Sequence, residues 1–404
     1  MDNRHTPSTC KRHCMVVYAY YPLAETRVQR EAEALLNHGY QVDVLCLRLP
    51  NEAAFEVVRG VNVYRLSLKR RHGQGFGVQL KEYLQFLILA AFKLIRLHNE
   101  KRYHVVQTHN LPDFLVFAAL WPKLKGAGVI LDIHDVMPEF FAERTGRSLD
   151  SWLVKLVSWQ EQLSCRFADH VITVTEPWRQ ALIKRGVSPH KTSVVMNVPD
   201  DNLFHRGVGK ANTQSDNSFC LIYHGVQSHR HGLDTLLHAV SGVRSQIPEL
   251  QLILHGRGEA HHELVELAKE LKLTDCVQFS TNFVSVSQLP HLVAQADVGV
   301  VPYRRDIFTD GILPTKLMEY VALGLPVISS RTPVIETYFD ETMVHFFESG
   351  DVSSLAASIL TLYQDSARRE ALVHSAEQFI QKYNWAAQAT QYVNLVKQLE
   401  RANF

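Results

Sequence analysis

The sequence lacks an excess of charge of either sign. Its 404 residues include 42 lysines and arginines against 41 aspartates and glutamates, so the formal net charge is +1 with histidine neutral. A chain without a strong overall field is not expected to attract nucleic acid or an acidic partner by charge. Hydrophobic residues make up 46% of the chain, which at this length is enough for two domains of ordinary size.

Cysteine is also scarce. The six cysteines are scattered along the chain, several of them within strand-like runs where small buried thiols are common. His5, Cys10, His13 and Cys14 could be considered as zinc ligands, but no paired ligands accompany them elsewhere, so we predict no metal site. Scattered thiols suit a reducing compartment, and the polar first residues do not resemble a signal peptide. We therefore expect a cytoplasmic protein.

No apolar run is long enough to span a bilayer. The most apolar helix, expected at 83–97, is too short and is interrupted by Gln85, Lys93 and Arg96. Residues 69–102 around it contain eight lysines and arginines and two glutamates. Two interpretations remain open: a core helix with a basic flank, or an interfacial helix that contacts anionic lipid as a peripheral membrane element at the inner face of the membrane.

What the sequence does contain is a regular alternation of strands and helices. Strands are expected at 14–20, 41–47, 104–108, 128–133, 170–174, 193–196, 219–224, 250–255, 277–279, 297–303 and 327–329. This alternation predicts an α/β protein with doubly wound, Rossmann-like domains. The turn after the first strand has no Gly-x-Gly-x-x-Gly, which argues against a dinucleotide oxidoreductase. The polar stretch at 206–218 has a linker's composition, so a domain boundary is predicted there.

The most informative stretch is residues 310–330, which read Asp-Gly-Ile-Leu-Pro-Thr-Lys-Leu-Met-Glu-Tyr-Val-Ala-Leu-Gly-Leu-Pro-Val-Ile-Ser-Ser. Pro314 and Thr315 predict a helix start. The free amides at such a start attract phosphate oxygens, and Lys316 adds a positive charge beside them. Glu319 lies one turn further on the same face, where its carboxylate could accept hydrogen bonds from both hydroxyls of a ribose.

This stretch resembles the donor-binding segment of the family 4 glycosyltransferases, which are retaining enzymes of the GT-B fold. The resemblance implies two Rossmann-like domains facing across a cleft. Residues 1–205 would form the acceptor side, residues 206–383 the sugar-nucleotide donor side, and 384–404 a last helix crossing back to the first domain. It also implies a set of donor contacts: Asp310, Gly311, Leu313, Thr315, Lys316 and Glu319. The family usually has a first glutamate where this chain has Gly311, so either Asp310 takes its task or the sugar is held differently.

Further segments resemble other donor-binding parts of the family. The loop that starts at Gly225 occupies the position of the family's first phosphate loop, and Arg230 is expected to supply its positive charge from a neighbouring position. Gly256 and Gly258 resemble the Gly-x-Gly turn near the nucleotide, and Phe283 falls in the segment that lies along the base. These positions complete the predicted donor site.

The strand expected at 128–133 leads directly to His134, at the strand end where ligands bind in open parallel sheets. Taken alone, a lone histidine is more often structural. The resemblance implies that His134 faces the transferred sugar near its reacting carbon, contacting the sugar and polarising the transition state rather than attacking. Asp135 and Glu139 are candidates for orienting His134 or for meeting the acceptor hydroxyl. Arg27 could either meet an anionic acceptor or be an ordinary salt-bridged or solvated arginine.

The resemblance implies transfer of a hexosyl group from a nucleotide-sugar, UDP- or GDP-linked, to a hydroxyl of a glycan or a lipid-linked acceptor. Such a reaction would serve glycan, polysaccharide or glycolipid biosynthesis. Neither a metal ion nor a cofactor is expected, because Lys316, Arg230 and the helix start can stabilise the leaving diphosphate. Two other functions stay open. One is a GT-B sugar-nucleotide epimerase, which needs no acceptor, and the other is a catalytically silent subunit that binds a nucleotide or glycan while a partner transfers.

Overall fold

The computed structural model of the protein describes residues 11–23, 25–68, 70, 75–208, 218–282 and 284–402. The chain divides into two compact units. The first unit comprises Met1–Met196 and Gln388–Phe404, and the second unit comprises Asn197–Ala387. The divisions predicted from the sequence lie at 205/206 and 383/384, so each of them differs from the observed division by a short segment.

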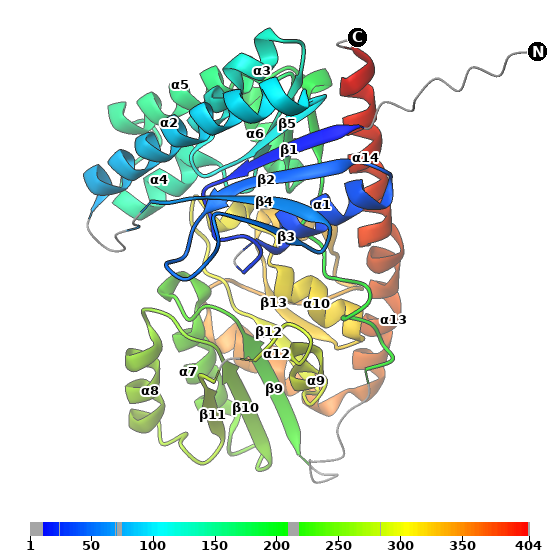
Figure 1. Ribbon diagram of the computed structural model, residues 1–404. Helices are drawn as coiled ribbons and strands as arrows, with labels where there is room; N and C mark the ends of the chain where they lie inside the picture. The colour runs from blue at the N-terminus through cyan, green and yellow to red at the C-terminus, as the bar shows by residue number, and fades with distance from the viewer. Residues whose placement is uncertain are drawn as a thin grey trace, which may run out of the picture. The chain divides into compact units, whose positions relative to one another are not determined.

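The first unit contains an eight-stranded sheet with the strand order β3-β4-β2-β1-β5-β6-β7-β8 (Figure 1). Its strands are β1 (Arg12–Val17), β2 (Gln41–Leu47), β3 (Phe55–Val58), β4 (Val61–Leu66), β5 (Val105–His109), β6 (Gly128–Ile133), β7 (His170–Thr173) and β8 (Thr192–Val194). All neighbours pair in parallel except β3 and β4, an antiparallel pair at one edge that the sequence analysis did not predict. The central strands β1, β5 and β6 are buried along almost their whole length, because helices cover both faces of the sheet.

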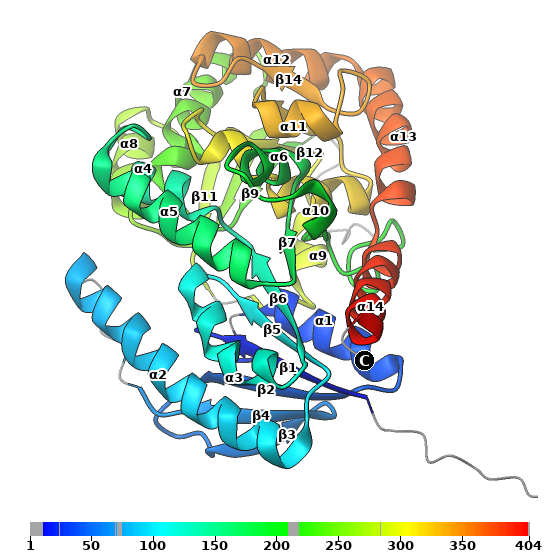
Figure 2. The same cartoon turned by 90° about the horizontal axis from the view of Figure 1, so that it is seen from above.

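The helices of the first unit lie on both sides of this sheet. They are α1 (Thr26–Asn37), α2 (Phe76–Lys101), η1 (Asp113–Ala119), α3 (Leu120–Leu124), α4 (Met137–Thr145), α5 (Trp152–Phe167), α6 (Glu176–Lys184) and η2 (Pro189–Lys191), joined by the end of α14 (Trp385–Ala402). Helices α2 and α3 cover one face, and α1 and α14 lie on the other (Figures 1 and 2). None of the helices in the described part of the chain is both long and apolar enough to cross a bilayer.

One helix differs from the expectation. A single helix was predicted to start at 109–113 and reach Leu124, but the structure has the 3₁₀ helix η1 followed by the short helix α3. Pro122 lies within α3 and has no backbone N–H, so a continuous ladder of α-helical hydrogen bonds cannot run through it.

The end of α14 belongs to the first unit. The Tyr392 hydroxyl donates a hydrogen bond of 2.5 Å to Gln107 Oε1 on β5, and Gln388 Oε1 accepts one of 2.7 Å from the Met196 amide. Tyr392 is fully buried. The last helix of the chain is therefore part of the core of the first unit.

The second unit contains a six-stranded, fully parallel sheet with the order β11-β10-β9-β12-β13-β14. Its strands are β9 (Phe219–His224), β10 (Leu250–His255), β11 (Val277–Ser280), β12 (Val298–Val301), β13 (Val327–Ser330) and β14 (His345–Phe347). Its helices are η3 (His229–His231), α7 (Leu233–Val243), α8 (His261–Glu270), α9 (Leu289–Val293), η4 (Thr309–Gly311), α10 (Thr315–Leu323), α11 (Pro333–Tyr338), α12 (Val352–Gln364) and α13 (Ser366–Lys382). The sheet is therefore doubly wound, as the alternation of elements predicted.

Helix α10 begins and ends close to where the sequence predicted. Pro314 precedes its first turn, and Gly324 ends it with a left-handed φ of 76°, a conformation that glycine adopts without strain. No side chain caps its first turn, so Thr315 does not have the capping role that the sequence analysis gave it. Thr315 is exposed, whereas Lys316 next to it is buried.

Candidate functional site

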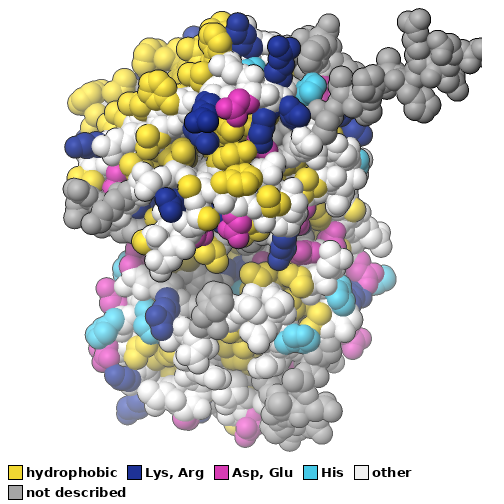
Figure 3. Space-filling view, viewed as in Figure 1, with side chains coloured by type: hydrophobic (Ala, Val, Ile, Leu, Met, Phe, Trp, Pro, Cys, Tyr) yellow, Lys and Arg dark blue, Asp and Glu magenta, His cyan; other side chains and the backbone are white. Residues whose placement is uncertain are grey.

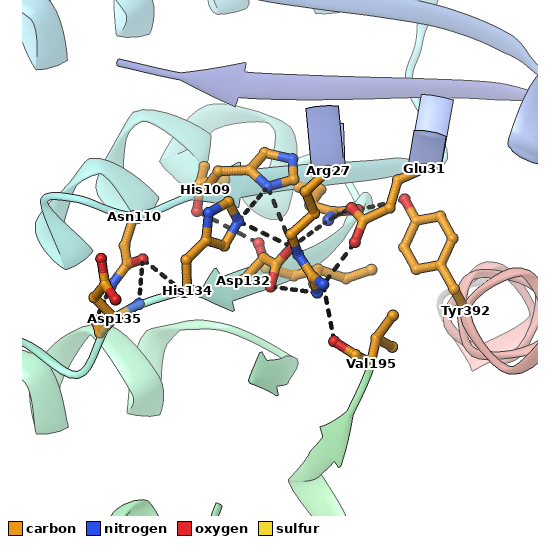
Figure 4. Close-up of polar contacts among 12 residues, drawn as sticks. Arg27, Glu31, His109, Asn110, Asp132, His134, Asp135, Val195 and Tyr392 are labelled. Atoms are coloured by element: carbon orange, nitrogen blue, oxygen red, sulfur yellow. Dashed lines mark hydrogen bonds and ion pairs between the residues drawn. The ribbon is translucent and has the colours of Figure 1, made fainter. Parts of the chain in front are cut away.

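Three side chains meet at the carboxyl ends of β5 and β6 in the first unit: His109, Asp132 and His134 (Figure 4). The Nδ1 atom of His109 lies 3.2 Å from Nε2 of His134 and 3.2 Å from Oδ2 of Asp132. Nε2 of His134 lies 3.4 Å from the same Asp132 oxygen. His109 and Asp132 are fully buried, and the His134 side chain is 20% exposed. His134 is therefore the member of this cluster that a substrate can reach.

Arg27 fixes the carboxylate of this cluster. Its guanidinium contacts both Asp132 oxygens at 3.0 Å, donates to the Val195 carbonyl at 2.8 Å and forms an ion pair with Glu31 at 3.1 Å. Of the two roles considered for Arg27, the structure shows the salt-bridged arginine, because its side chain is buried within its own unit. An Arg27 that holds Asp132 is not free to bind an acceptor.

The electrostatics of the cluster favour a charged His134. Burial by itself would raise the pKa of Asp132, but Arg27 and the two histidines hold it well below its usual range. Burial lowers the pKa of His109 to about 4. Burial also acts to lower the pKa of His134, yet the adjacent Asp132 carboxylate raises it above its ordinary value. His134 can thus carry the proton while His109 stays neutral.

The same three residues have the chemistry of a metal-binding set, since their ligand atoms lie within 4.8 Å of one another. However, both Asp132 oxygens are already bonded to the Arg27 guanidinium, whose positive charge repels a cation. The arrangement therefore suits a proton shared between imidazoles better than a metal ion.

Asn110 holds the backbone around His134. Its Oδ1 accepts a hydrogen bond of 2.8 Å from the His134 amide, and its Nδ2 donates to the Asp135 carbonyl at 2.6 Å and to Asp113 at 2.8 Å. None of Asp132, His109 and Asn110 was among the site residues predicted from the sequence. His109 and Asn110 end or follow a parallel strand in the same way as His134, so applying the strand-end rule to every strand would have found them.

Glu139 does not contact His134. Its Oε1 forms an ion pair of 2.7 Å with Arg185, which is also paired with the buried Glu161 at 2.7 Å. The helix turn that carries Glu139 thus directs its carboxylate toward α5 and α6 rather than toward the strand ends. The partners that orient the His134 ring are Asp132 and His109. Asp135 stays beside His134, but its described contacts with Asn110 are made by its backbone.

In the second unit, Lys316 is a buried cation surrounded by hydroxyl groups. Its Nζ donates to the hydroxyl oxygens of Tyr303 at 2.8 Å and Tyr223 at 3.2 Å, and lies 4.8 Å and 4.5 Å from the two ring centroids. Within the described part of the chain, Lys316 forms no ion pair with a carboxylate. A buried ammonium whose direct partners are neutral hydroxyls retains charge with which to bind an anion.

Glu319 is linked to the end of β9. Its Oε2 lies 2.7 Å from Nε2 of His224, and Nδ1 of His224 lies 3.2 Å from the Tyr320 hydroxyl. Burial, together with Lys316, lowers the pKa of His224 to about 3, so this imidazole is neutral near pH 7. Burial raises the pKa of Glu319 to about 7, and Lys316 opposes this rise. Glu319 thus changes charge near neutral pH while His224 positions its carboxyl group.

The predicted glycines let two loops pack against each other. A Cβ atom on Gly256 would lie 2.1 Å from the Gly225 carbonyl oxygen, and one on Gly258 would lie 2.1 Å from the Gln227 carbonyl oxygen. A Cβ atom on Gly225 would come within 3.3 Å of Lys316 Nζ. Gly225 and Gly256 also have left-handed φ values of 115° and 127°. Only glycines allow this approach, which brings the loop after β9 next to Lys316.

The remaining residues of the predicted donor site differ in their contacts and burial. Asp310 forms a two-bond ion pair with Arg305, at 3.1 and 2.8 Å. Arg230 lies over the Phe308 ring at 5.4 Å from its centroid. Gly311 and Leu313 are buried near the start of α10, and Phe283 lies outside the described residues. The structure therefore groups Gly225, Lys316 and Glu319 most clearly, with Asp310 already engaged by another side chain.

Comparisons with known proteins agree with this division of the chain. Residues 24–197 match the family described as "Glycosyl transferase 4-like domain", and residues 209–379 match "Glycosyl transferases group 1". A chitobiosyldiphosphodolichol beta-mannosyltransferase of Debaryomyces hansenii is 21% identical over 360 residues, covering 80% of this chain and 74% of that protein. A sulfoquinovosyl transferase of Arabidopsis thaliana is 24% identical over 296 residues, covering 70% of this chain and 54% of that protein.

Solved structures show the same fold. A sucrose-phosphate synthase from Thermosynechococcus elongatus superposes with a TM-score of 0.76 at 22% identity, covering 97% of this chain and 100% of the other. HepE from Anabaena, solved in complex with UDP, gives a TM-score of 0.71 at 16% identity, covering 96% of this chain and 100% of the other. Two parallel-sheet α/β units of this kind make up the GT-B fold.

Proposed function

Since the chain belongs to the family 4 glycosyltransferases of the GT-B fold, we propose that it moves a hexosyl group from a nucleotide-sugar to an acceptor hydroxyl with retention of configuration. The observation that carries the proposal is Lys316, a buried cation whose hydrogen-bond partners among the described residues are the Tyr223 and Tyr303 hydroxyls. It lies beside Gly225, at the carboxyl end of β9. A diphosphate is the anion that this reaction releases, and Lys316 is suited to bind it.

In this proposal the nucleotide is held by the second unit. The phosphates lie against the loop after β9 and the first turn of α10, where free amides and Lys316 attract negative charge. Glu319 accepts hydrogen bonds from the ribose hydroxyls while His224 holds its other side. Arg230 and Lys316 together stabilise the leaving diphosphate, so the transfer needs no metal ion. UDP and GDP are the first donors to test, and HepE, a structural neighbour, is a protein solved with UDP.

In the first unit, His134 is proposed to contact the transferred sugar. Its raised pKa leaves it able to donate a hydrogen bond from a charged imidazole to a hydroxyl of the transferred sugar, which would hold the reacting carbon in place. Asp132 and His109 orient the ring through contacts of 3.4 and 3.2 Å. We assign no attacking group to the protein, so the acceptor hydroxyl attacks on the face that the leaving group occupied.

The acceptor is proposed to be a glycan or a lipid-linked molecule, used at the inner face of a membrane in the cytoplasm. On α2, Leu84, Ile88 and Phe92 recur every four residues and are exposed, Phe92 by 70%. On α5, Trp152 and Trp159 are exposed by 71% and 57%. Figure 3 shows hydrophobic side chains gathered over these two helices. Apolar and tryptophan side chains beside basic residues are typical of surfaces that contact lipid.

Vesicle flotation tests the membrane contact. The protein should float with anionic vesicles at low salt, and Phe92→Ser should reduce the floating fraction. Phe55→Ser is the control, because Phe55 is also exposed, by 49%, but lies on β3. If the protein ignores anionic vesicles at low salt, the membrane contact is disproved.

A second candidate function is a catalytically silent subunit that binds the nucleotide without transferring. It is favoured by Gly311, which stands where the family usually has a glutamate, and by the pairing of Asp310 with Arg305. The experiment that separates the candidates incubates the purified protein with UDP- and GDP-hexoses and follows the anomeric proton by NMR. Slow release of a free hexose of unchanged anomeric configuration supports a retaining transferase. Conversion of the donor to another sugar-nucleotide indicates an epimerase, and no reaction despite nucleotide binding supports the silent subunit.

A further inference from the structure

A cavity of about 510 Å³ opens in the first unit at the carboxyl ends of its central strands. Tyr18, directly after β1, and Leu111, two residues after the end of β5, both line it. The sheet order reverses between β1 and β5, because the chain runs from β1 toward β2 on one side and returns to β5 on the other. Ligands of doubly wound proteins bind at such a switch point. The cavity is therefore placed where this fold forms a binding site.

The walls of the cavity are largely aromatic. Phe76 and Tyr83 come from α2, and Phe140 and Phe141 come from α4. The rings of Phe76 and Phe141 lie 5.3 Å apart and meet edge to face. Phe76 is also 56% exposed, so an apolar wall of the cavity continues to the surface of α2. These rings suit a flexible hydrocarbon chain.

Two arginines add positive charge to the same cavity. The Arg70 guanidinium lies over the Tyr18 ring at 5.3 Å, and the Arg144 guanidinium lies over the Phe140 ring at 5.9 Å. In the described ranges of the chain, neither arginine forms an ion pair with a carboxylate. Among the described residues that line the cavity, the one acidic side chain is Glu82, which accepts a hydrogen bond of 3.1 Å from the Tyr18 hydroxyl. The cavity thus offers two guanidinium groups to an anion, and guanidinium binds phosphate oxygens in a fork.

The cavity also borders the segments that carry the catalytic candidates. Leu111 follows His109 by two residues, and Met137, another lining residue, follows His134 by three. A molecule seated in the cavity with its phosphate at Arg144 would therefore lie beside the loops that present His134. This is the position expected of an acceptor.

We propose that this cavity binds the lipid phosphate of a lipid-linked acceptor, with the hydrocarbon against the aromatic walls and the phosphate at Arg70 and Arg144. The inference rests on the proposed function, because it names the acceptor class of the same reaction. A free glycan has neither a hydrocarbon chain for the aromatic walls nor a phosphate for the two arginines, so a lipid-linked acceptor matches the cavity better.

Calorimetric titration with farnesyl diphosphate tests the inference, with the donor nucleotide present at saturation so that the diphosphate cannot occupy the Lys316 site. Farnesyl diphosphate should bind, and inorganic diphosphate and farnesol should each bind at least about tenfold more weakly. Inorganic diphosphate lacks the hydrocarbon chain, and farnesol lacks the phosphates. Equal affinity for inorganic diphosphate would contradict the lipid part of the inference.

A variant pair locates the binding. Arg144→Met should weaken farnesyl diphosphate binding about tenfold, the change expected from losing one charge-assisted hydrogen bond. Arg147→Met is the control, since Arg147 is exposed nearby but does not line the cavity. Both variants should keep the thermal midpoint and the nucleotide affinity of the unaltered protein. Equal farnesyl diphosphate affinity in the two variants, or nucleotide binding without any farnesyl diphosphate binding, overturns this inference and leaves the proposed transferase function standing.

Discussion

The Nε2 atom of His224 lies 2.7 Å from Oε2 of Glu319, so the end of β9 and the second turn of α10 are joined by a short hydrogen bond. The Tyr320 hydroxyl receives the His224 amide hydrogen and lies 3.2 Å from Nδ1 of the same ring. Because an ionised carboxylate can only accept hydrogen bonds, the neutral His224 ring then carries its proton on Nε2 and donates it to Glu319. This hydrogen bond fixes Oε2 of Glu319 and so orients the whole carboxylate toward a ligand.

Removing this carboxylate should weaken nucleotide binding. Charge-assisted hydrogen bonds contribute about 1.5 to 3 kcal/mol, so Glu319→Ala should lower the affinity roughly tenfold to a hundredfold. Calorimetric titration measures the change. Glu370→Ala is the matched control, because Glu370 is exposed on α13 of the same unit. Equal affinities in the two variants would remove Glu319 from the site.

The affinity for a nucleoside should depend on pH. Burial raises the pKa of Glu319 to about 7, so below that pH the group is increasingly protonated and cannot accept from both ribose hydroxyls. If binding requires the ionised form, affinity falls as pH drops below 7, approaching about tenfold per pH unit. A nucleoside is the appropriate ligand because it has no titrating phosphate. Glu319→Gln should lose this dependence, and an unchanged pH profile in that variant would refute the assignment.

Loss of the Lys316 charge should act directly on the binding of phosphates. Lys316→Met keeps an apolar stem between the Tyr223 and Tyr303 rings but removes the ammonium group. Because Lys316 also holds down the pKa of Glu319, the ligands are compared well above pH 7, where Glu319 is ionised. There, nucleoside diphosphate binding should weaken by at least about tenfold, while nucleoside binding stays unchanged. A parallel loss for both ligands would indicate a structural rather than a phosphate-binding lysine.

The strand ends were the most predictable part of this protein. Strands β2, β6, β9 and β10 have the bounds that the sequence predicted, because parallel strands buried on both faces are continuous apolar runs bounded by polar or glycine residues. The position of His134 at the end of β6 followed from the same reasoning. The edge pair β3 and β4 was missed because its strands are partly exposed and short.

Contacts between segments that are distant in the chain could not be predicted from the sequence. Tyr223 and Tyr303 come from the ends of neighbouring strands, and only the pairing of β9 with β12 brings both hydroxyls to Lys316. Glu139 shows the converse, since its nearness to His134 in sequence suggested a contact that the direction of α4 does not allow. The periodicity of apolar residues shows which helix or strand a residue belongs to. The side chain that it contacts on another element depends on the order of the strands in the sheet.

Removing the Arg27 cation from its buried ion pairs should destabilise the protein much more than removing a cation from an exposed pair of the same spacing. Arg27→Met leaves two buried carboxylates, Glu31 and Asp132, without their cation, which should destabilise the first unit by about 3 to 5 kcal/mol. Arg96→Met is the control, because Arg96 and Glu100 form an exposed pair, also four residues apart, and should change stability by less than about 1 kcal/mol. Urea unfolding followed by circular dichroism compares them. Similar losses in both variants would contradict the role given to Arg27.

The packing of the two nucleotide-side loops should tolerate no side chain at Gly256. Gly256→Ala places a Cβ atom 2.1 Å from the Gly225 carbonyl oxygen at a left-handed φ, so the loops must separate and nucleotide affinity should fall. Gly242→Ala has open space on α7 and should stabilise the protein by about 0.5 to 1 kcal/mol. Thermal unfolding and nucleotide titration of both variants check this. An unaltered affinity in Gly256→Ala would show that the loop packing does not shape the site.

Turnover should depend on His134 without a change in nucleotide binding. His134→Ala removes the charged imidazole at the strand end, which should depress turnover by roughly a hundredfold or more, the usual range for a positioned acid or base. His190→Ala, at an exposed histidine of η2, is the matched control. Initial rates with the donor identified by binding provide the measurement. Equal turnover in both variants would count against a catalytic His134.

The donor site around Lys316 is tested most directly by calorimetric titration of the unaltered protein with UDP, GDP, ADP and CMP, repeated on Lys316→Met. We expect that one nucleoside diphosphate binds selectively, with a dissociation constant of about micromolar order, and that the variant binds it at least about tenfold more weakly. Failure of all four nucleotides to bind, or equal binding by the variant, would contradict a donor site built around Lys316.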